Sequence, residues 1–352
     1  MVRMRARDMG LELGGEPGRH NAITDVEGVG VGHVTLIEGD DTRTGVTAIT
    51  PHPGNLYEEK VAAAVDVLNG YGKSVGLTQI MFEGNVETPI MLTETLNTYR
   101  VADALIDYCV KGYGLTPRSV NAVVGETNGG YLTDNFRRAV GAEHVFKAID
   151  EARRARGAVA EGNVGAGTPM TGYGFKGGIG TSSRRVGAAN LGALVQLNCG
   201  RKEDFLVAGA PVGAEVKLPE TPTPGPGNSI MMIVATDVAL DTRQLWKVAK
   251  RTAMGLARTG SYSGNGSGDF TIAFTTGGLG SDEYASSLDE LKDVRGDGVL
   301  SPLYKATVEA TEEAILNALF KAETMTGFQD HVRHALPLDQ TEKVLRKYGR
   351  LG

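Results

Sequence analysis

One serine in this chain, Ser229, lies at a position where cleavage of the chain by itself would create an N-terminal nucleophile. Ser229 lies between a proline-rich stretch and the apolar run 230–235, which predicts a buried strand. The five prolines from Pro211 to Pro226 argue against a helix or a central strand there. Cleavage before Ser229 would leave a hydroxyl and an α-amine of pKa about 7.7–8.0 on one residue, so that the amine can act as its base. A surface loop leading into an ordinary strand is the alternative.

Two further predicted strands carry polar side chains at their ends. Ser267 and Asp269 adjoin the strand-like run 270–275, and strand alternation would turn both side chains the same way. Such a pair would orient a proton for a serine nucleophile, whereas a simple turn is the competing interpretation. Asn198 ends the run 194–198 with an amide that can donate to an oxyanion or close a turn.

Glu126 directly follows a third strand-like segment, residues 119–125, and begins a polar loop. A carboxylate there would hold a substrate ammonium through a charge-assisted hydrogen bond. A solvated loop acid is the alternative.

Other motifs are weaker candidates. The G-x-G-x-x-G run at 172–177 neither opens a helix nor has an acid before Glu203, as a dinucleotide site requires. His331 and His334 lie in a polar stretch without the further ligands of a zinc site. Nothing around Cys199 predicts a low thiol pKa. We therefore expect no cofactor and no metal.

Composition limits the class of protein. The 352 residues carry a net charge of −6, which favours no nucleic-acid partner, and 49 glycines, about twice the usual share. Two cysteines make no disulfide framework. No signal peptide and no membrane span is evident in the sequence, so a cytoplasmic protein without membrane contact is the expectation.

The periodicity predicts mixed strands and helices without regular alternation, which indicates layered α/β architecture in one domain, residues 1–352. Thr88 and Pro89 are interpreted as the start of an amphipathic helix that reaches Cys109. Paired glycine-rich strands are predicted at 173–185 and 188–198. Helices are predicted at about 143–157, from Asp241 with Gln244 in a capping box, at 302–322 and at 339–348.

Several stretches together resemble the P1 family of self-processing aminopeptidases, which includes L-aminopeptidase/D-Ala-esterase/amidase and the β-aminopeptidases. They occur in order over most of the chain, and the long glycine-rich one is quite specific. The stretches are NAITDVEGVGVGHVTL (21–36), VVGETNGGYLTD (123–134), EGNVGAGTPMTGYGFKGGIGTSSR (161–184), LVQLNCG (194–200), PGNSIMMIVATD (226–237) and NGSGDFTIAFTT (265–276).

The resemblance implies a four-layered αββα sandwich of the N-terminal-nucleophile type. It implies cleavage between Asn228 and Ser229 into an α piece, 1–228, and a β piece, 229–352, which assemble into a homo-oligomer, a tetramer of αβ units. The site roles that it implies are nucleophile for Ser229, a proton-handling Ser and carboxylate for Ser267 and Asp269, oxyanion donor for Asn198 and amine receptor for Glu126. Asp269 stands where the family often has the longer Glu.

One departure concerns the oxyanion pocket. Some members have a tyrosine two residues after the amine-binding Glu, whereas this chain has Asn128, which also belongs to the expected substrate-binding residues. The expected activity is release of N-terminal amino acids from short peptides, amides or esters. An acyltransferase of the ornithine acetyltransferase type is a rival, although those enzymes use threonine, and an uncleaved, non-catalytic homologue is another.

Overall fold

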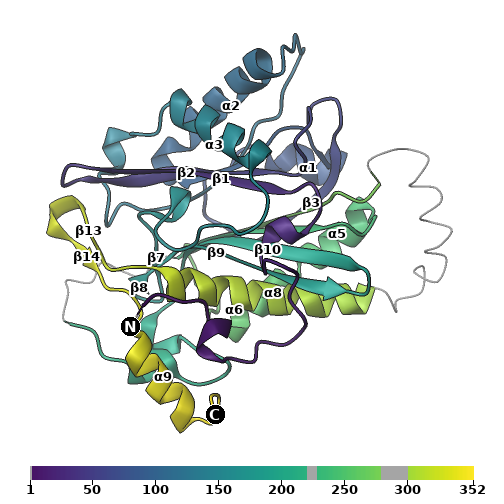
Figure 1. The fold of residues 1–352 in the computed structure, drawn as a ribbon. Coiled ribbons are helices and arrows are strands. Elements are labelled where there is room, and N and C mark those ends of the chain that lie inside the picture. The colour runs from purple at the N-terminus through teal and green to yellow at the C-terminus, as the bar shows by residue number, and fades with distance from the viewer. Residues whose placement is uncertain (1, 220–227, 279–299) are drawn as a thin grey trace.

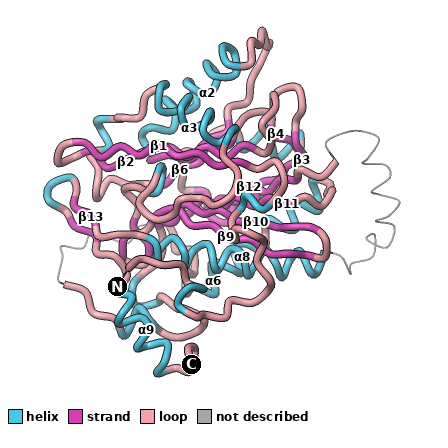
Figure 2. Tube along the Cα trace, viewed as in Figure 1, coloured by secondary structure: helices cyan, strands magenta, loops and turns pink. Residues whose placement is uncertain are grey.

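Two β-sheets face each other in the computed structural model, which describes residues 2–219, 228–278 and 300–352. Helices cover the outer face of each sheet, so the layers run helix, sheet, sheet, helix (Figure 1). Tracing the chain by secondary structure shows the strands stacked in the middle and the helices outside them (Figure 2). The fold is the αββα sandwich expected from the sequence. Residues 220–227, which include the last three prolines of the proline-rich stretch, lie outside the described residues.

The first sheet has four strands and the second has six. The order in the first is β1 (Gly30–Glu38), β2 (Thr42–Thr50), β5 (Ile90–Glu94) and β6 (Val123–Thr127). The order in the second is β4 (Asn85–Val86), β3 (Val61–Gly70), β12 (Gly268–Thr275), β11 (Ser229–Thr236), β10 (Ala189–Asn198) and β9 (Gly178–Val186). Two small hairpins are β7 (Thr171–Gly172) with β8 (Phe175–Lys176), and β13 (Met325–Thr326) with β14 (Val332–Arg333).

Each outer layer belongs to one sheet. The helices α2 (Thr98–Gly112) and α3 (Ala142–Arg154) pack on the four-stranded sheet. The six-stranded sheet is covered by α5 (Thr242–Ala249), α6 (Thr252–Arg258) and α8 (Leu300–Lys321). The remaining helices are α1 (Leu77–Glu83), α4 (Val212–Glu215) and α9 (Leu338–Lys347). Across the described part of the chain, no helix has the length and apolar content needed to cross a bilayer.

The apolar core is divided by the sheets into three layers. Strand β11 shows how, because Met231, Ile233 and Ala235 lie in the cluster between the two sheets. The alternate residues Ile230 and Met232 lie in the cluster between the second sheet and its helices. A third cluster joins the first sheet to α2 and α3. A strand buried on both faces is apolar at every position, as the run 230–235 is.

Part of the high glycine content is explained by close packing of helices on strands. A Cβ at Gly180 of β9 would lie 1.9 Å from the carbonyl oxygen of Ala314 in α8. A Cβ at Gly32 of β1 would lie 2.2 Å from that of Ala148 in α3. A side chain at either position would force the helix away from the sheet.

Most of the predicted elements are present. The glycine-rich strands at 173–185 and 188–198 are β9 and β10, an antiparallel pair, with β8 just before them. Helix α5 begins with the predicted capping box, in which Gln244 N donates a hydrogen bond to Asp241 Oδ1 and Asp241 N donates one to Gln244 Oε1. The helices at 143–157, 302–322 and 339–348 correspond to α3, α8 and α9.

The helix predicted to start at Thr88 and Pro89 is wrong at its beginning. Residues 90–94 form the strand β5, and the helix begins only at Thr98. The apolar spacing was ambiguous because β5 is buried on both faces, and such a strand carries no alternation to separate it from a helix. Tyr99 and Ile106, expected on the buried side, are exposed.

Candidate active site

Ser229 is the first residue of β11, at the boundary between the loop and the core where the sequence placed it. It pairs with Asn198 of β10 on one side and with Gly268 of β12 on the other. Alternation with Met231 turns its side chain toward the space between the sheets. The Ser229 hydroxyl oxygen accepts a hydrogen bond from Gly268 N at 3.2 Å. A hydroxyl that is half-buried at a strand end is accessible to a substrate and still held by the sheet.

Asn198 lies directly across from Ser229 and on the same face of the sheet. Its Oδ1 accepts a hydrogen bond from Thr171 N at 2.8 Å, and its Nδ2 donates to the carbonyl oxygen of Asn128 at 2.9 Å. These two bonds orient the amide. Because an amide nitrogen carries two hydrogens, one donor of Asn198 is left for an oxyanion beside Ser229.

Lys176, which the sequence did not single out, holds the loop that positions Asn198. Its ammonium is fully buried and donates to the carbonyl oxygens of Gly167, Met170 and Gly177 at 2.8–3.0 Å. Burial lowers the pKa of Lys176 well below its usual value. The same loop presents Thr171 N to Asn198, so Lys176 supports the orientation of the Asn198 amide.

Ser267 and Asp269 interact as the alternation predicted. The Ser267 hydroxyl donates to Asp269 Oδ1 at 2.5 Å, and Asn69 Nδ2 donates to the other carboxylate oxygen at 3.2 Å. Burial raises the pKa of Asp269, and the hydrogen bond from Ser267 is the largest effect opposing it. Because Phe270 points between the sheets, the Ser267–Asp269 pair faces the helix layer, on the opposite side of the strand from the Ser229 side chain.

Glu126 is brought to the same end of the sandwich by a short connecting segment. Tyr71 N donates to the carbonyl oxygen of Ser267 at 3.1 Å, and Lys73 N donates to Glu126 Oε1 at 2.8 Å. Between them, a Cβ at Gly72 would lie 2.7 Å from the Phe270 ring and 3.2 Å from Glu126 Oε1. The residue Glu126 is only 4% exposed. The structure thus makes Glu126 a buried acid at the end of β6, not a solvated loop residue.

A second buried carboxyl, Glu94, ends the neighbouring strand β5 and was not found from the sequence. It accepts hydrogen bonds from Leu96 N and from Asn97 Nδ2. Burial, together with the negative charge of Glu126, raises the pKa of Glu94 to about 8. The misassigned helix hid it, because a helical position offers no reason to place this acid beside Glu126.

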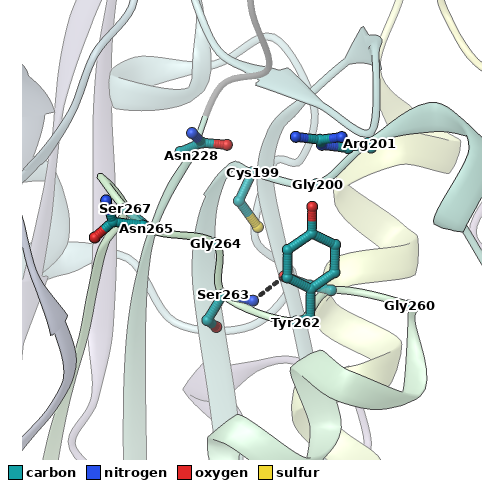
Figure 3. Close-up of a pocket in the computed structure, with 11 residues that line it drawn as sticks. Cys199, Gly200, Arg201, Asn228, Gly260, Tyr262, Ser263, Gly264, Asn265 and Ser267 are labelled. Atoms are coloured by element: carbon teal, nitrogen blue, oxygen red, sulfur yellow. Dashed lines mark hydrogen bonds between the residues drawn. The ribbon is translucent and has the colours of Figure 1, made fainter.

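A cavity of about 240 Å³ is lined in part by Asn228, the residue before Ser229. Figure 3 shows it between the Cys199–Arg201 turn and the loop 260–265, with Asn228 and Ser267 at its edge. Asn228 and Ser267 therefore line the same cavity. Cys199 lies in the wall of the cavity, and burial raises the pKa of its thiol, which is opposite to what a thiolate nucleophile needs.

The side chain and the main chain of Asn128 contact different groups. Its side-chain oxygen accepts hydrogen bonds from Gly130 N at 2.9 Å and Asn135 Nδ2 at 3.2 Å, and the residue is exposed. Only its main-chain carbonyl contacts Asn198. The expected role of the Asn128 side chain in substrate binding stays a prediction.

The weaker motifs have structural partners. The glycine run at 172–177 forms the β7–β8 hairpin, with Tyr173 and Gly174 at positive φ in its turn, and opens no helix. His331 stacks on the Tyr131 ring and bonds to the Tyr131 carbonyl oxygen at 2.9 Å. Within residues 2–219, 228–278 and 300–352, no group of three or more His, Cys, Asp or Glu is arranged to hold a metal.

Comparison with known proteins places this geometry in a family. Residues 21–333 match peptidase family S58. The beta-peptidyl aminopeptidase BapA of Sphingosinicella xenopeptidilytica is 38% identical over 371 residues, with 97% of this chain and 91% of that protein covered. The solved structure of the PH0078 protein from Pyrococcus horikoshii OT3 is 46% identical with a TM-score of 0.86, and covers 99% of this chain and 100% of its own.

A third relative connects the fold to its chemistry. The L-aminopeptidase D-Ala-esterase/amidase of Ochrobactrum anthropi, described as a prototype for the serine aminopeptidases and a variant of the Ntn hydrolase fold, is 36% identical. Its TM-score is 0.85, and 99% of each chain is covered. The likeness extends over whole chains and includes both sheets that carry the site. The chain therefore belongs to peptidase family S58 and is an aminopeptidase with the N-terminal-nucleophile hydrolase fold.

Proposed function

We propose that the chain cuts itself between Asn228 and Ser229 and then uses Ser229 as the nucleophile of its aminopeptidase reaction. The observation that carries this proposal is the position of Ser229 at the start of β11, between Asn198 and Gly268, with Asn228 at the edge of the adjoining cavity. A residue at that point keeps its place in the sheet when the chain before it is released. The pieces would be residues 1–228 and 229–352.

The processing step is an acyl shift followed by hydrolysis. The Ser229 hydroxyl attacks the Asn228 carbonyl carbon, the C–N bond breaks, and the nitrogen leaves as the new α-amine of Ser229. Water then opens the ester, which gives a carboxylate on Asn228 and frees the hydroxyl. We propose that Ser267, which lines the same cavity as Asn228, and its partner Asp269 orient the amine, whose pKa near 8 suits a general base.

In each turnover the same groups act on a substrate. The substrate ammonium pairs with the Glu126 carboxylate, which places the first carbonyl against Ser229. The hydroxyl attacks, its proton passes to the α-amine, and Asn198 Nδ2 donates to the oxyanion. The leaving amine takes the proton, and water then releases the acyl group from Ser229.

The substrates we propose are short peptides and amino-acid amides or esters with a free amine. Two relatives support this choice by their names, one a beta-peptidyl aminopeptidase and the other an L-aminopeptidase and D-Ala-esterase/amidase. We also propose a cytoplasmic location, because Cys109 and Cys199 are both buried free thiols, as is usual in a reducing compartment. The homo-oligomer of αβ units stays a prediction from the family resemblance. A panel of aminoacyl p-nitroanilides with α-, β-, L- and D-residues measures the preference.

Glu126→Gln tests the amine-binding role. Loss of a charge-assisted hydrogen bond of about 1.5–3 kcal/mol should lower kcat/KM on free-amine substrates by about 10- to 200-fold. Self-cleavage should be unaffected, because it involves no free amine before the cut. The measurement compares an aminoacyl anilide with its N-acetyl analogue in wild type and variant. Equal wild-type rates on the two substrates would show that Glu126 is not an amine receptor.

Metal removal provides a second test. A serine nucleophile with an amine base needs no Lewis acid, so exhaustive dialysis against EDTA should leave kcat/KM on the best anilide within about twofold of the untreated enzyme. Activity lost to EDTA and restored by zinc would contradict the proposed mechanism.

A further inference from the structure

The cavity beside Asn228 and Ser267 has a lining that the steps above do not use. Arg201 contributes a guanidinium at its edge, and Ser261, Tyr262 and Asn265 add hydroxyl and amide groups. None of its eleven described lining residues is acidic. The lining therefore offers hydrogen-bond donors and a positive charge, which suit an anion.

Arg201 is available for such a ligand. In the described part of the chain its guanidinium has no hydrogen-bond or ion-pair partner, and the residue is exposed. Figure 3 shows Arg201 on the same side of the cavity as Asn228, with the Tyr262 hydroxyl directed toward Arg201. A planar guanidinium with five donors is matched to a carboxylate.

The opposite wall of the cavity is held in place. Asn69, which also bonds Asp269, donates to the carbonyl oxygen of Ser263 at 2.7 Å, and Ser263 N donates to the Ser261 hydroxyl oxygen at 3.3 Å. Ser263 has a positive φ of 51°, a conformation that costs energy and persists only where surrounding contacts impose it. Tyr262 is thus carried by an anchored turn.

The groups on the two sides of the nucleophile differ in charge, apart from the Asp269 carboxylate behind Ser267, whose two oxygens already accept hydrogen bonds from Ser267 and Asn69. Buried carboxyls, Glu126 and Glu94, lie at the end of the first sheet, whereas Arg201 lies in the cavity that borders the cleavage position. A dipeptide has the same polarity, with an ammonium before the scissile bond and a carboxylate after it. About 240 Å³ is below the usual range of about 300–1,000 Å³ for drug-sized ligands, so the cavity suits one residue or little more.

We propose that this cavity binds the free carboxylate of the residue that follows the scissile bond, with Arg201 as its cation, so that the enzyme favours dipeptides over longer or amidated substrates. The inference rests on the proposed function, because it takes Ser229 as the point from which the two ends of the substrate are placed. It adds the leaving-group side to a site in which Glu126 is the proposed receptor of the substrate amine.

The test uses two substrates that differ only in the terminal group. They are X-Ala and X-Ala amide, where X is the residue that wild type releases fastest from its p-nitroanilide. Arg201→Gln should lower kcat/KM on X-Ala by about 10-fold and change that on X-Ala amide by less than about twofold, since one exposed charge-assisted contact is lost. Raising the salt concentration should reduce the ratio of wild-type kcat/KM on X-Ala to that on X-Ala amide, because salt screens the charge of Arg201.

Matched variants separate recognition from general effects of charge. Arg118→Gln removes the same charge from an exposed residue in the loop before β6, outside the cavity, and should leave the ratio of the two kcat/KM values unchanged. Arg201→Lys keeps the positive charge but lacks the planar, two-pronged guanidinium, so the ratio of kcat/KM on X-Ala to kcat/KM on X-Ala amide should lie between those of wild type and Arg201→Gln. Mass spectrometry confirms that each variant is processed.

The outcomes are distinct. A selective loss on X-Ala in Arg201→Gln, absent in Arg118→Gln, supports the proposal. An equal change in kcat/KM on both substrates overturns the proposal and indicates that Arg201 pairs with the carboxylate created at Asn228. No change in kcat/KM on either substrate also overturns the proposal. If wild type cleaves neither substrate nor any anilide of the panel, the proposed function itself fails, before Arg201 is tested.

Discussion

Replacing Ser229 with alanine should leave one uncut chain without aminopeptidase activity. Both reactions attributed to Ser229 need the same hydroxyl, and loss of a nucleophile typically costs about 10⁴-fold or more in kcat. Wild type should give fragments of residues 1–228 and 229–352 by mass spectrometry, whereas Ser229→Ala should give the intact mass. Packing should change little, because only one oxygen is removed from a half-buried strand end.

Two controls make this result specific. Ser119→Ala alters an exposed loop serine and should be processed and active like wild type. Ser229→Thr keeps the hydroxyl and should still produce some cleaved chain. Wild type that remains uncut and yet releases amino acids at a normal rate would eliminate an N-terminal nucleophile, whatever the behaviour of the alanine variant.

Asn198→Asp should have the next largest effect. It removes the amide donor beside Ser229, together with the hydrogen bond to the Asn128 carbonyl oxygen, and loss of one oxyanion donor costs about 10²- to 10³-fold in kcat. KM should change little, because the bond forms mainly in the transition state. The acceptor for Thr171 N remains, since Oδ1 is present in both side chains. Steady-state kinetics on the best anilide, normalised to the fraction of chain that begins at Ser229, measures the effect.

The matched control for this variant is Asn55→Asp. Asn55 Oδ1 also accepts a main-chain hydrogen bond, from Tyr57 N at 3.1 Å, so the substitution adds the same charge and keeps the same kind of contact. Its kcat should stay within about twofold of wild type. An Asn198→Asp enzyme that is folded, processed and equally fast would remove Asn198 from the oxyanion site.

Local patterns in the sequence determined much of the fold. The capping box at Asp241 and Gln244, the glycine-rich hairpin of β9 and β10 and the long helix α8 are encoded within about 20 residues each, which is the range over which periodicity and caps act. The start of β11 at Ser229 was determined in the same way, by prolines followed by an apolar run.

The sequence could pair only residues that were close along the chain. It predicted that Ser267 and Asp269 share a face, because two positions on one strand have a known relation. It missed Asn69, which completes that pair from β3, and Glu94, because a doubly buried strand resembles a helix segment. Lys176 gave no signal, since its three acceptors are main-chain carbonyls.

The tertiary structure decided which ends of which strands meet. Antiparallel pairing places Asn198 opposite Ser229, and the segment at Gly72 connects Glu126 to the strand that begins at Gly268. Folding also buries the carboxyls of Glu94 and Glu126, and it places Arg201 and Asn228 in the lining of one cavity. Register and burial of this kind arise from contacts between segments far apart in sequence, and no local propensity records them.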